Sequence, residues 1–90
     1  AHRNDPLTDL GLSSGDYYDL TKRILALVPA GRRLAFLEGG YDLDAITTST
    51  AATLAALAGV EHRPEPVTSG AADEPGHQSV GAARLIHHLA

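Results

Sequence analysis

Gly39, Gly40 and Tyr41 are the residues whose types and spacing are best suited to chemistry. They follow a short apolar run at 34–37 and precede a long helical pattern. Two glycines permit a sharp turn with positive φ and leave space for a small ligand beside the backbone. In an open α/β sheet, a strand-to-helix turn of this kind lies where ligands bind. The Tyr41 phenol could therefore donate a hydrogen bond to a substrate carbonyl and to the oxyanion that develops from it.

The elements that would position this turn are a helix before it, a strand leading into it and a helix after it. Ser13 is suited to cap the first helix, and Asp16 would lie near the positive end of that helix. Pro29 and Gly31 would end it. The continuous apolar run at 34–37 is typical of a parallel strand covered on both faces. The apolar residues at helical spacing in the first helix are Tyr17, Leu20, Ile24, Leu27 and Val28.

A second helix is predicted at 43–58, with Asp42 as its cap and Gly59 as its end. Helix, strand and helix make one repeat of a doubly wound α/β fold, and one repeat alone cannot cover both faces of a sheet. Residues 61–76 are rich in proline and glycine, which predicts a linker. Residues 77–90 are predicted to contain a terminal helix.

Composition excludes several classes of protein. The chain has 90 residues, no cysteine and a formal net charge of −4. Without cysteine, neither a disulfide framework nor a cysteine zinc cluster can form. The negative charge argues against a protein that binds nucleic acid through phosphate contacts, and no apolar stretch reaches the roughly 18 residues that a membrane helix needs. We therefore expect a cytoplasmic protein whose partners are neither nucleic acid nor membrane.

Several sequence blocks resemble the histone deacetylase superfamily. Residues 37–43, Leu-Glu-Gly-Gly-Tyr-Asp-Leu, closely resemble the C-terminal active-site motif of this family, which includes acetylpolyamine amidohydrolases and acetoin-utilisation proteins. Glu38 makes the motif more similar to the class II and bacterial branch than to class I. Residues 1–7, Ala-His-Arg-Asn-Asp-Pro-Leu, resemble the segment that follows Gly-Phe-Asp in the family pattern. Residues 66–70, Pro-Val-Thr-Ser-Gly, are similar to a tail found in bacterial members.

The resemblance implies that the chain is the C-terminal part of a longer zinc-dependent deacetylase, which we call the full-length parent. The fold would be α/β, the C-terminal part of an arginase–deacetylase-type three-layer α/β/α fold with a parallel sheet. Residues 1–60 would be the C-terminal portion of the catalytic domain. The zinc ligands and the histidine pair of the family would lie upstream of Ala1, so His2 would neighbour a metal ligand without being one. The 90-residue chain alone is therefore expected to be inactive.

The resemblance also implies roles for particular residues of this chain. Tyr41 would be catalytic, donating to the acetyl carbonyl oxygen on the side opposite the zinc ion. Gly39 and Gly40 would line the narrow slot for the acetyl group or the acyl-lysine stem. Pro6 and Leu7 would wall the substrate channel, where an apolar surface suits a methylene stem. The partners would be an acetylated lysine or polyamine substrate and the upstream part of the same catalytic domain.

Two alternatives to a catalytic segment stay open. Tyr41 could simply close a Gly-Gly turn in a structural α/β fragment. The chain could also belong to a different amidohydrolase, or to a degenerate member that binds acetylated ligands without hydrolysing them. Asp5 is expected to accept a hydrogen bond from the loop backbone, in an Asx-type turn before Pro6, and not to touch substrate.

Overall fold

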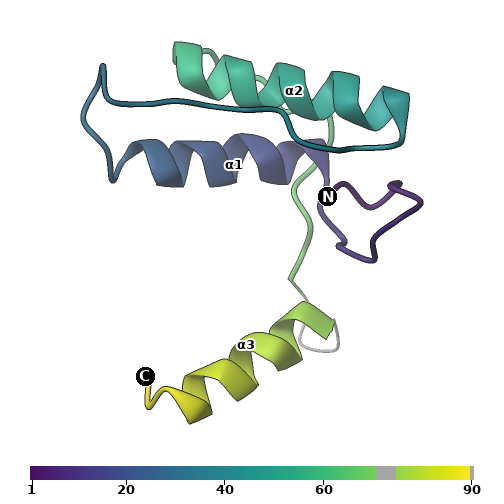
Figure 1. The fold of residues 1–90 in the computed structure, drawn as a ribbon, viewed down its shortest axis with the longest axis vertical. Coiled ribbons are helices and arrows are strands. Elements are labelled where there is room, and N and C mark those ends of the chain that lie inside the picture. Colours follow the sequence, from purple (N-terminus) through teal and green to yellow (C-terminus); the bar gives the residue numbers. More distant parts are fainter. Residues whose placement is uncertain (71–74, 90) are drawn as a thin grey trace.

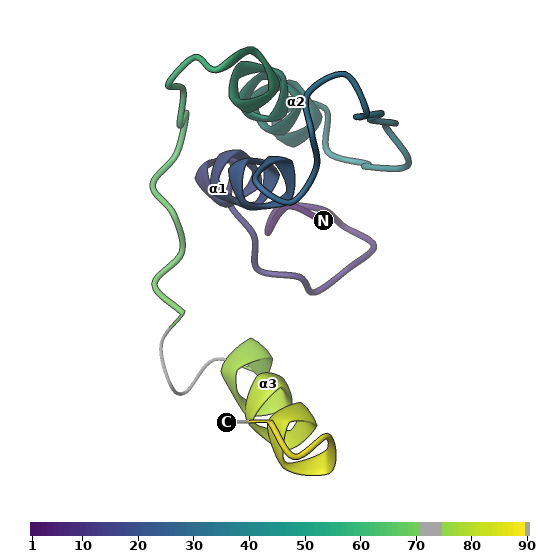
Figure 2. The same cartoon turned by 90° about the vertical axis from the view of Figure 1, so that its left-hand side faces the viewer.

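Two packed helices and a separate third helix make up the structure. The computed structural model describes residues 1–70 and 75–89. Its helices are α1 (Ser14–Leu25), α2 (Leu43–Ala58) and α3 (Pro75–Ile86). α1 and α2 run in the same direction, and the extended segment 32–42 returns from the end of α1 to the start of α2 (Figure 1). Figure 2 shows α1 and α2 side by side, whereas α3 contacts neither of them in the described part of the chain.

Side chains form hydrogen bonds with backbone groups at both ends of α1. The Ser13 Oγ accepts a hydrogen bond from the Asp16 N–H at 3.2 Å, and the Asp16 Oδ2 accepts one from the Ser13 N–H at 2.8 Å. This capping box confirms the predicted start of the helix and satisfies N–H groups that no helical carbonyl can reach. At the other end, the Arg33 guanidinium donates to the carbonyl oxygens of Leu25 and Val28 at 2.9 and 2.7 Å.

α2 confirms the second predicted helix and its bounds. The Asp42 Oδ1 accepts a hydrogen bond from the Ala45 N–H at 2.8 Å, which caps the first turn. Gly59 ends the helix in the left-handed conformation, with φ +75°, which glycine adopts without a steric penalty. The start of α2 is therefore fixed at Leu43, two positions after Tyr41.

A tyrosine and two alanines hold α1 against α2. Tyr18 is 2 % exposed and packs with Ala52 and Ala56, which are also buried. The small alanine side chains let the two helices approach closely. The Arg63 guanidinium lies over the Tyr18 ring, 4.4 Å from its centroid, in a cation–π contact. The apolar residues predicted at helical spacing in α1 do not supply this contact, and one of them, Ile24, is 61 % exposed.

The predicted three-layer α/β/α fold with a parallel sheet is wrong, because the described residues form three helices and no strand. An isolated parallel bridge joins His2 and Leu12. Residues 34–37, predicted as a strand, are extended and exposed, and Leu34 and Phe36 are 88 % and 83 % exposed. A strand exists only through backbone hydrogen bonds to a neighbouring strand. Among the described residues, no strand lies beside this run. An apolar run alone is therefore not enough to predict a strand.

The sequence predicts a terminal helix within 77–90, and α3 overlaps this range but begins two residues earlier. It spans Pro75–Ile86, and its large side chains Val80, Leu85 and Ile86 are exposed. Of the helices in residues 1–70 and 75–89, none combines the length and the apolar character needed to cross a membrane. The division of the chain into catalytic portion, linker and terminal helix stays a prediction.

Candidate functional site

A cavity of about 730 Å³ lies between α1, α2, the N-terminal loop and the extended segment that precedes α2. The predicted site residues Gly39, Gly40 and Tyr41 line it. Asp5 from the N-terminal loop and Tyr17 from α1 line it as well. The turn before α2 therefore faces a space large enough for a small ligand.

Gly39 and Gly40 form the sharp turn that the sequence predicts. Their φ angles are +66° and +96°, in the left-handed region that favours glycine. A Cβ on Gly40 would also lie 2.9 Å from the Ile46 Cγ1 atom of α2. Backbone conformation and the close approach of α2 therefore both require glycine at position 40.

Tyr41 combines an accessible phenol with a restrained backbone. The residue is 61 % exposed and lines the cavity. Its Cε2 and hydroxyl oxygen lie 3.8 and 3.9 Å from the position that a Gly39 Cβ would take, so the phenol lies over the glycine turn. The Tyr41 N–H donates a hydrogen bond to the Asp5 Oδ2 at 3.0 Å. An accessible phenol of this kind can donate to a ligand oxygen.

Asp5 connects the N-terminal loop with the glycine turn. Its Oδ1 accepts a hydrogen bond from the Leu7 N–H at 2.8 Å, which confirms the Asx-type turn predicted before Pro6. The bond from the Tyr41 N–H joins residues 36 positions apart, and the sequence does not predict it. An Asx turn has a local sequence signal, whereas a contact between two distant loops has none.

Pro6 and Leu7 lie at the surface of the N-terminal loop. Leu7 is 68 % exposed, and neither residue is among those that line the cavity. The Asp5 carboxylate nevertheless ties the loop that carries them to the turn that carries Tyr41. Their role as walls of a substrate channel stays a prediction.

Asp5 also acts on a second phenol in the cavity wall. Burial raises the pKa of the Tyr17 phenol, and the Asp5 carboxylate raises that pKa further because it disfavours a second negative charge. Tyr17 therefore stays neutral well above neutral pH. It lines the cavity as an uncharged group, beside the acid that holds Tyr41.

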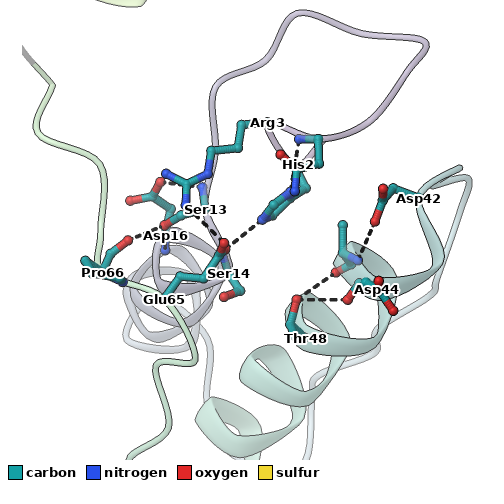
Figure 3. Close-up of polar contacts among 12 residues, drawn as sticks. His2, Arg3, Ser13, Ser14, Asp16, Asp42, Asp44, Thr48, Glu65 and Pro66 are labelled. Atoms are coloured by element: carbon teal, nitrogen blue, oxygen red, sulfur yellow. Dashed lines mark hydrogen bonds and ion pairs between the residues drawn. The ribbon is translucent and has the colours of Figure 1, made fainter.

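A second polar cluster, which the sequence does not predict, joins Glu65 to the start of α1 and to the N-terminal loop (Figure 3). The Glu65 carboxylate accepts hydrogen bonds from the Ser14 N–H at 2.8 Å and from the Arg3 guanidinium at 3.0 Å. The His2 Nε2 lies 2.7 Å from the same carboxylate. Since the His2 Nδ1 accepts from the Asn4 N–H at 3.1 Å, the proton is assigned to Nε2, which donates to Glu65.

Residues 61–68, the segment that contains Glu65, lie along the first turn of α1. The Ser13 hydroxyl donates to the Pro66 carbonyl oxygen at 2.7 Å, and the Thr68 N–H donates to the Asp16 Oδ1 at 2.9 Å. Burial opposes ionisation of Asp16, but the N–H groups of Ser13 and Thr68 hold its pKa below the ordinary value. The segment is therefore attached to the helix that forms one wall of the cavity.

Protonation of Glu65 is expected to weaken this attachment at acid pH. The Ser14 N–H and then His2 lower the pKa of Glu65 from 4.5 to about 2. A carboxylate with a lowered pKa stabilises the folded state above its unfolded pKa, and this contribution is lost as the pH falls from about 4.5 toward about 2. Glu65→Gln should therefore lower the melting temperature of the full-length parent at about pH 6, and much less at about pH 3.

The exposed Glu38 provides the control for this measurement. Glu38→Gln removes the same charge outside the cluster and should leave the melting temperature unchanged at both pH values. A decrease for Glu65→Gln that is equal at both pH values would contradict a role for the ionised Glu65 carboxylate.

The donor set of the described residues does not fit a catalytic zinc ion. The described residues contain no group of three His, Cys, Asp or Glu side chains that could hold a metal, whereas a catalytic zinc site uses three protein ligands. His2, which lines the cavity, is bonded to Asn4 and Glu65. The chemistry that these residues themselves can supply is hydrogen bonding from the Tyr41 phenol.

Comparison with known proteins places the chain in a family. Residues 1–57 match the histone deacetylase domain family. The chain is 38 % identical over 102 residues to histone deacetylase 10, chloroplastic, of Oryza sativa subsp. japonica, and this alignment covers 99 % of the chain and 22 % of that protein. It is 36 % identical over 97 residues to histone deacetylase 14, chloroplastic, of Arabidopsis thaliana, covering 99 % of the chain and 23 % of that protein. No solved structure matches the chain significantly.

The matched region contains the elements that surround the cavity. Residues 1–57 include the N-terminal loop, α1, the glycine turn with Tyr41, and nearly all of α2. The chain spans less than a quarter of the length of the two curated relatives. The relationship predicted from the sequence blocks is confirmed, and the chain belongs to the histone deacetylase family.

Proposed function

We propose that this chain is the C-terminal segment of a zinc-dependent deacetylase that hydrolyses the acetamide of acetyl-lysine or of an acetylated polyamine. Membership of the histone deacetylase family supports a hydrolase of this kind. The observation that carries the proposal is the position of Tyr41, a residue that is 61 % exposed, lines the cavity and has its phenol over the turn of Gly39 and Gly40.

The contribution of this chain to the reaction would be stabilisation of the oxyanion. When water attacks the acetyl carbon, the carbonyl π electrons move to the oxygen, and the Tyr41 hydroxyl donates a hydrogen bond to the growing charge. A donor that binds the oxyanion more strongly than the substrate carbonyl lowers the barrier. The zinc ion and the groups that move protons would be held by the rest of the full-length parent.

The other predicted site residues would shape the approach to Tyr41. Gly39 and Gly40 have no side chains beside the phenol, so a flat acetyl group could lie against their backbone. Pro6 and Leu7 would form an apolar wall for the methylene stem, on the loop that Asp5 ties to Tyr41. An acetylated amine on a flexible apolar stem is the substrate that suits these groups.

The test is release of acetate by the full-length parent. An acetyl-lysine peptide and an N-acetylated polyamine are assayed side by side, and at least one of them is expected to be hydrolysed. A metal chelator should abolish the activity, and added zinc should restore it. Binding of both compounds without any acetate release would instead support a non-catalytic member of the family and contradict the proposed reaction.

A further inference from the structure

Asp5 is a buried acid in the wall of the cavity, 8 % exposed. Each of its carboxylate oxygens accepts a backbone N–H, Oδ1 from Leu7 at 2.8 Å and Oδ2 from Tyr41 at 3.0 Å. The Asp5 N–H donates to the His2 carbonyl oxygen at 2.9 Å, which fixes Asp5 itself within the N-terminal loop. One side chain therefore joins two loops that meet at the cavity.

The backbone on either side of Tyr41 shows why this bond matters for the phenol. On the N-terminal side, Gly39 and Gly40 adopt φ angles of +66° and +96°, and glycine itself imposes few limits on the backbone. On the C-terminal side, Asp42 caps α2 and fixes the chain. The Tyr41 residue is 61 % exposed, so packing restrains it little. The bond to Asp5 therefore adds a direct restraint on the backbone at the N-terminal side of Tyr41.

The chemistry proposed for Tyr41 depends on a narrow range of positions. An oxyanion donor acts at about 2.7–3.1 Å from the oxygen, and a displacement of about 1 Å can cost roughly a hundredfold in rate. Hydrogen bonds to an ionised acceptor are about twice as strong as those between neutral groups. A carboxylate therefore holds the Tyr41 backbone more firmly than a neutral acceptor would.

We propose that Asp5 is a positioning residue for Tyr41, an inference that rests on the catalytic role proposed above for Tyr41. The Asp5 carboxylate fixes the Tyr41 backbone, so that the phenol stays within reach of the substrate oxygen. Through Oδ1, which accepts from the Leu7 N–H, Asp5 also holds the loop of Pro6 and Leu7 in a fixed position relative to the phenol. Asp5 acts through these backbone bonds and does not itself touch the substrate.

The test is a double-mutant cycle in the full-length parent with Asp5→Asn and Tyr41→Phe. An asparagine side chain has one acceptor oxygen, so it cannot accept a hydrogen bond at both of the positions that the Asp5 Oδ1 and Oδ2 occupy. Asp5→Asn is expected to lower kcat by about tenfold to a hundredfold, with a much smaller change in KM. In the Tyr41→Phe background, the same substitution is expected to lower kcat no further, because the hydroxyl that it positions is absent.

Asp16→Asn is the matched control. Asp16 also uses both carboxylate oxygens to hold backbone N–H groups, those of Ser13 and Thr68, at the start of α1. Asp16→Asn is expected to lower the melting temperature and to leave kcat near the wild-type value. If Asp5→Asn does not fold, Asp5→Glu enters the same cycle, because it keeps two acceptor oxygens but displaces them by one methylene group.

Two results would overturn the inference. One is a wild-type kcat for the folded Asp5 variant. The other is an equal fold-loss of kcat from that variant with and without the Tyr41 hydroxyl, which would mean that Asp5 does not act through Tyr41. Wild-type kcat in Tyr41→Phe alone would instead overturn the catalytic role of Tyr41, so the two failures are distinguishable.

Discussion

Replacing Gly15 by alanine is expected to detach residues 61–68 from the first turn of α1. A Cβ on Gly15 would lie 2.2 Å from the Glu65 carbonyl oxygen and 3.1 Å from the Pro66 carbonyl carbon. Both are backbone atoms, so the segment cannot yield by turning a side chain. At an unobstructed helical position, alanine in place of glycine stabilises by about 1 kcal/mol. Overpacking costs about 1–3 kcal/mol, and moving this segment also breaks its hydrogen bonds, so the net effect is destabilising.

Hydrogen exchange of residues 61–70 in the full-length parent measures this effect locally. Since about 1.4 kcal/mol corresponds to a tenfold change in an equilibrium constant, exchange in Gly15→Ala should accelerate by roughly tenfold. Gly81→Ala in α3 is the control, because no atom lies within 4 Å of a Cβ at Gly81. Exchange at 61–70 should not change in that variant. Equal exchange rates in the two variants would contradict the close packing of this segment on Gly15.

Local signals in the sequence were sufficient to predict the start of α1 and both ends of α2, whereas α1 ends at Leu25, before the predicted Pro29 and Gly31. The capping pair of Ser13 and Asp16 acts over three positions, and so does the bond between Asp42 and the Ala45 N–H. Gly59 ends α2 through its own backbone conformation. The glycine turn before Tyr41 belongs to the same class, because its geometry depends on adjacent residues.

Contacts between distant segments could not be predicted in this way. The strand prediction at 34–37 failed because a strand depends on a neighbour, which an apolar run does not specify. The Glu65 carboxylate holds an N–H group 51 positions earlier in the chain, and Asp5 holds one 36 positions later. Neither periodicity nor a short motif in one sequence links positions so far apart. The hydrogen bond between the Tyr41 N–H and Asp5 was therefore visible only in the structure.

Replacing Tyr41 by phenylalanine is expected to lower kcat of the full-length parent by about a hundredfold, which corresponds to about 2.7 kcal/mol of transition-state stabilisation. The phenyl ring keeps its shape, and the backbone bond to Asp5 does not involve the hydroxyl. The loss would therefore report on the hydroxyl alone. KM and zinc content should change little, because the strong interaction is made with the oxyanion and not with the bound substrate.

Tyr17→Phe is the matched control for this prediction. Tyr17 lines the same cavity from α1 and also carries a phenol, but it does not follow the glycine turn. Removal of its hydroxyl should leave most of the turnover. A loss as large as that of Tyr41→Phe would mean that any phenol in this cavity matters equally, and the specific role of Tyr41 would be contradicted.

The most direct measurement compares kcat and melting temperature for the wild-type and Tyr41→Phe full-length parent, with an acetyl-lysine peptide as substrate. If the Tyr41 hydroxyl stabilises the oxyanion, kcat falls by roughly a hundredfold while the melting temperature stays the same. If Tyr41 only closes the turn after Gly39 and Gly40, kcat stays at the wild-type value and the melting temperature changes instead. That second result would contradict the catalytic role of Tyr41.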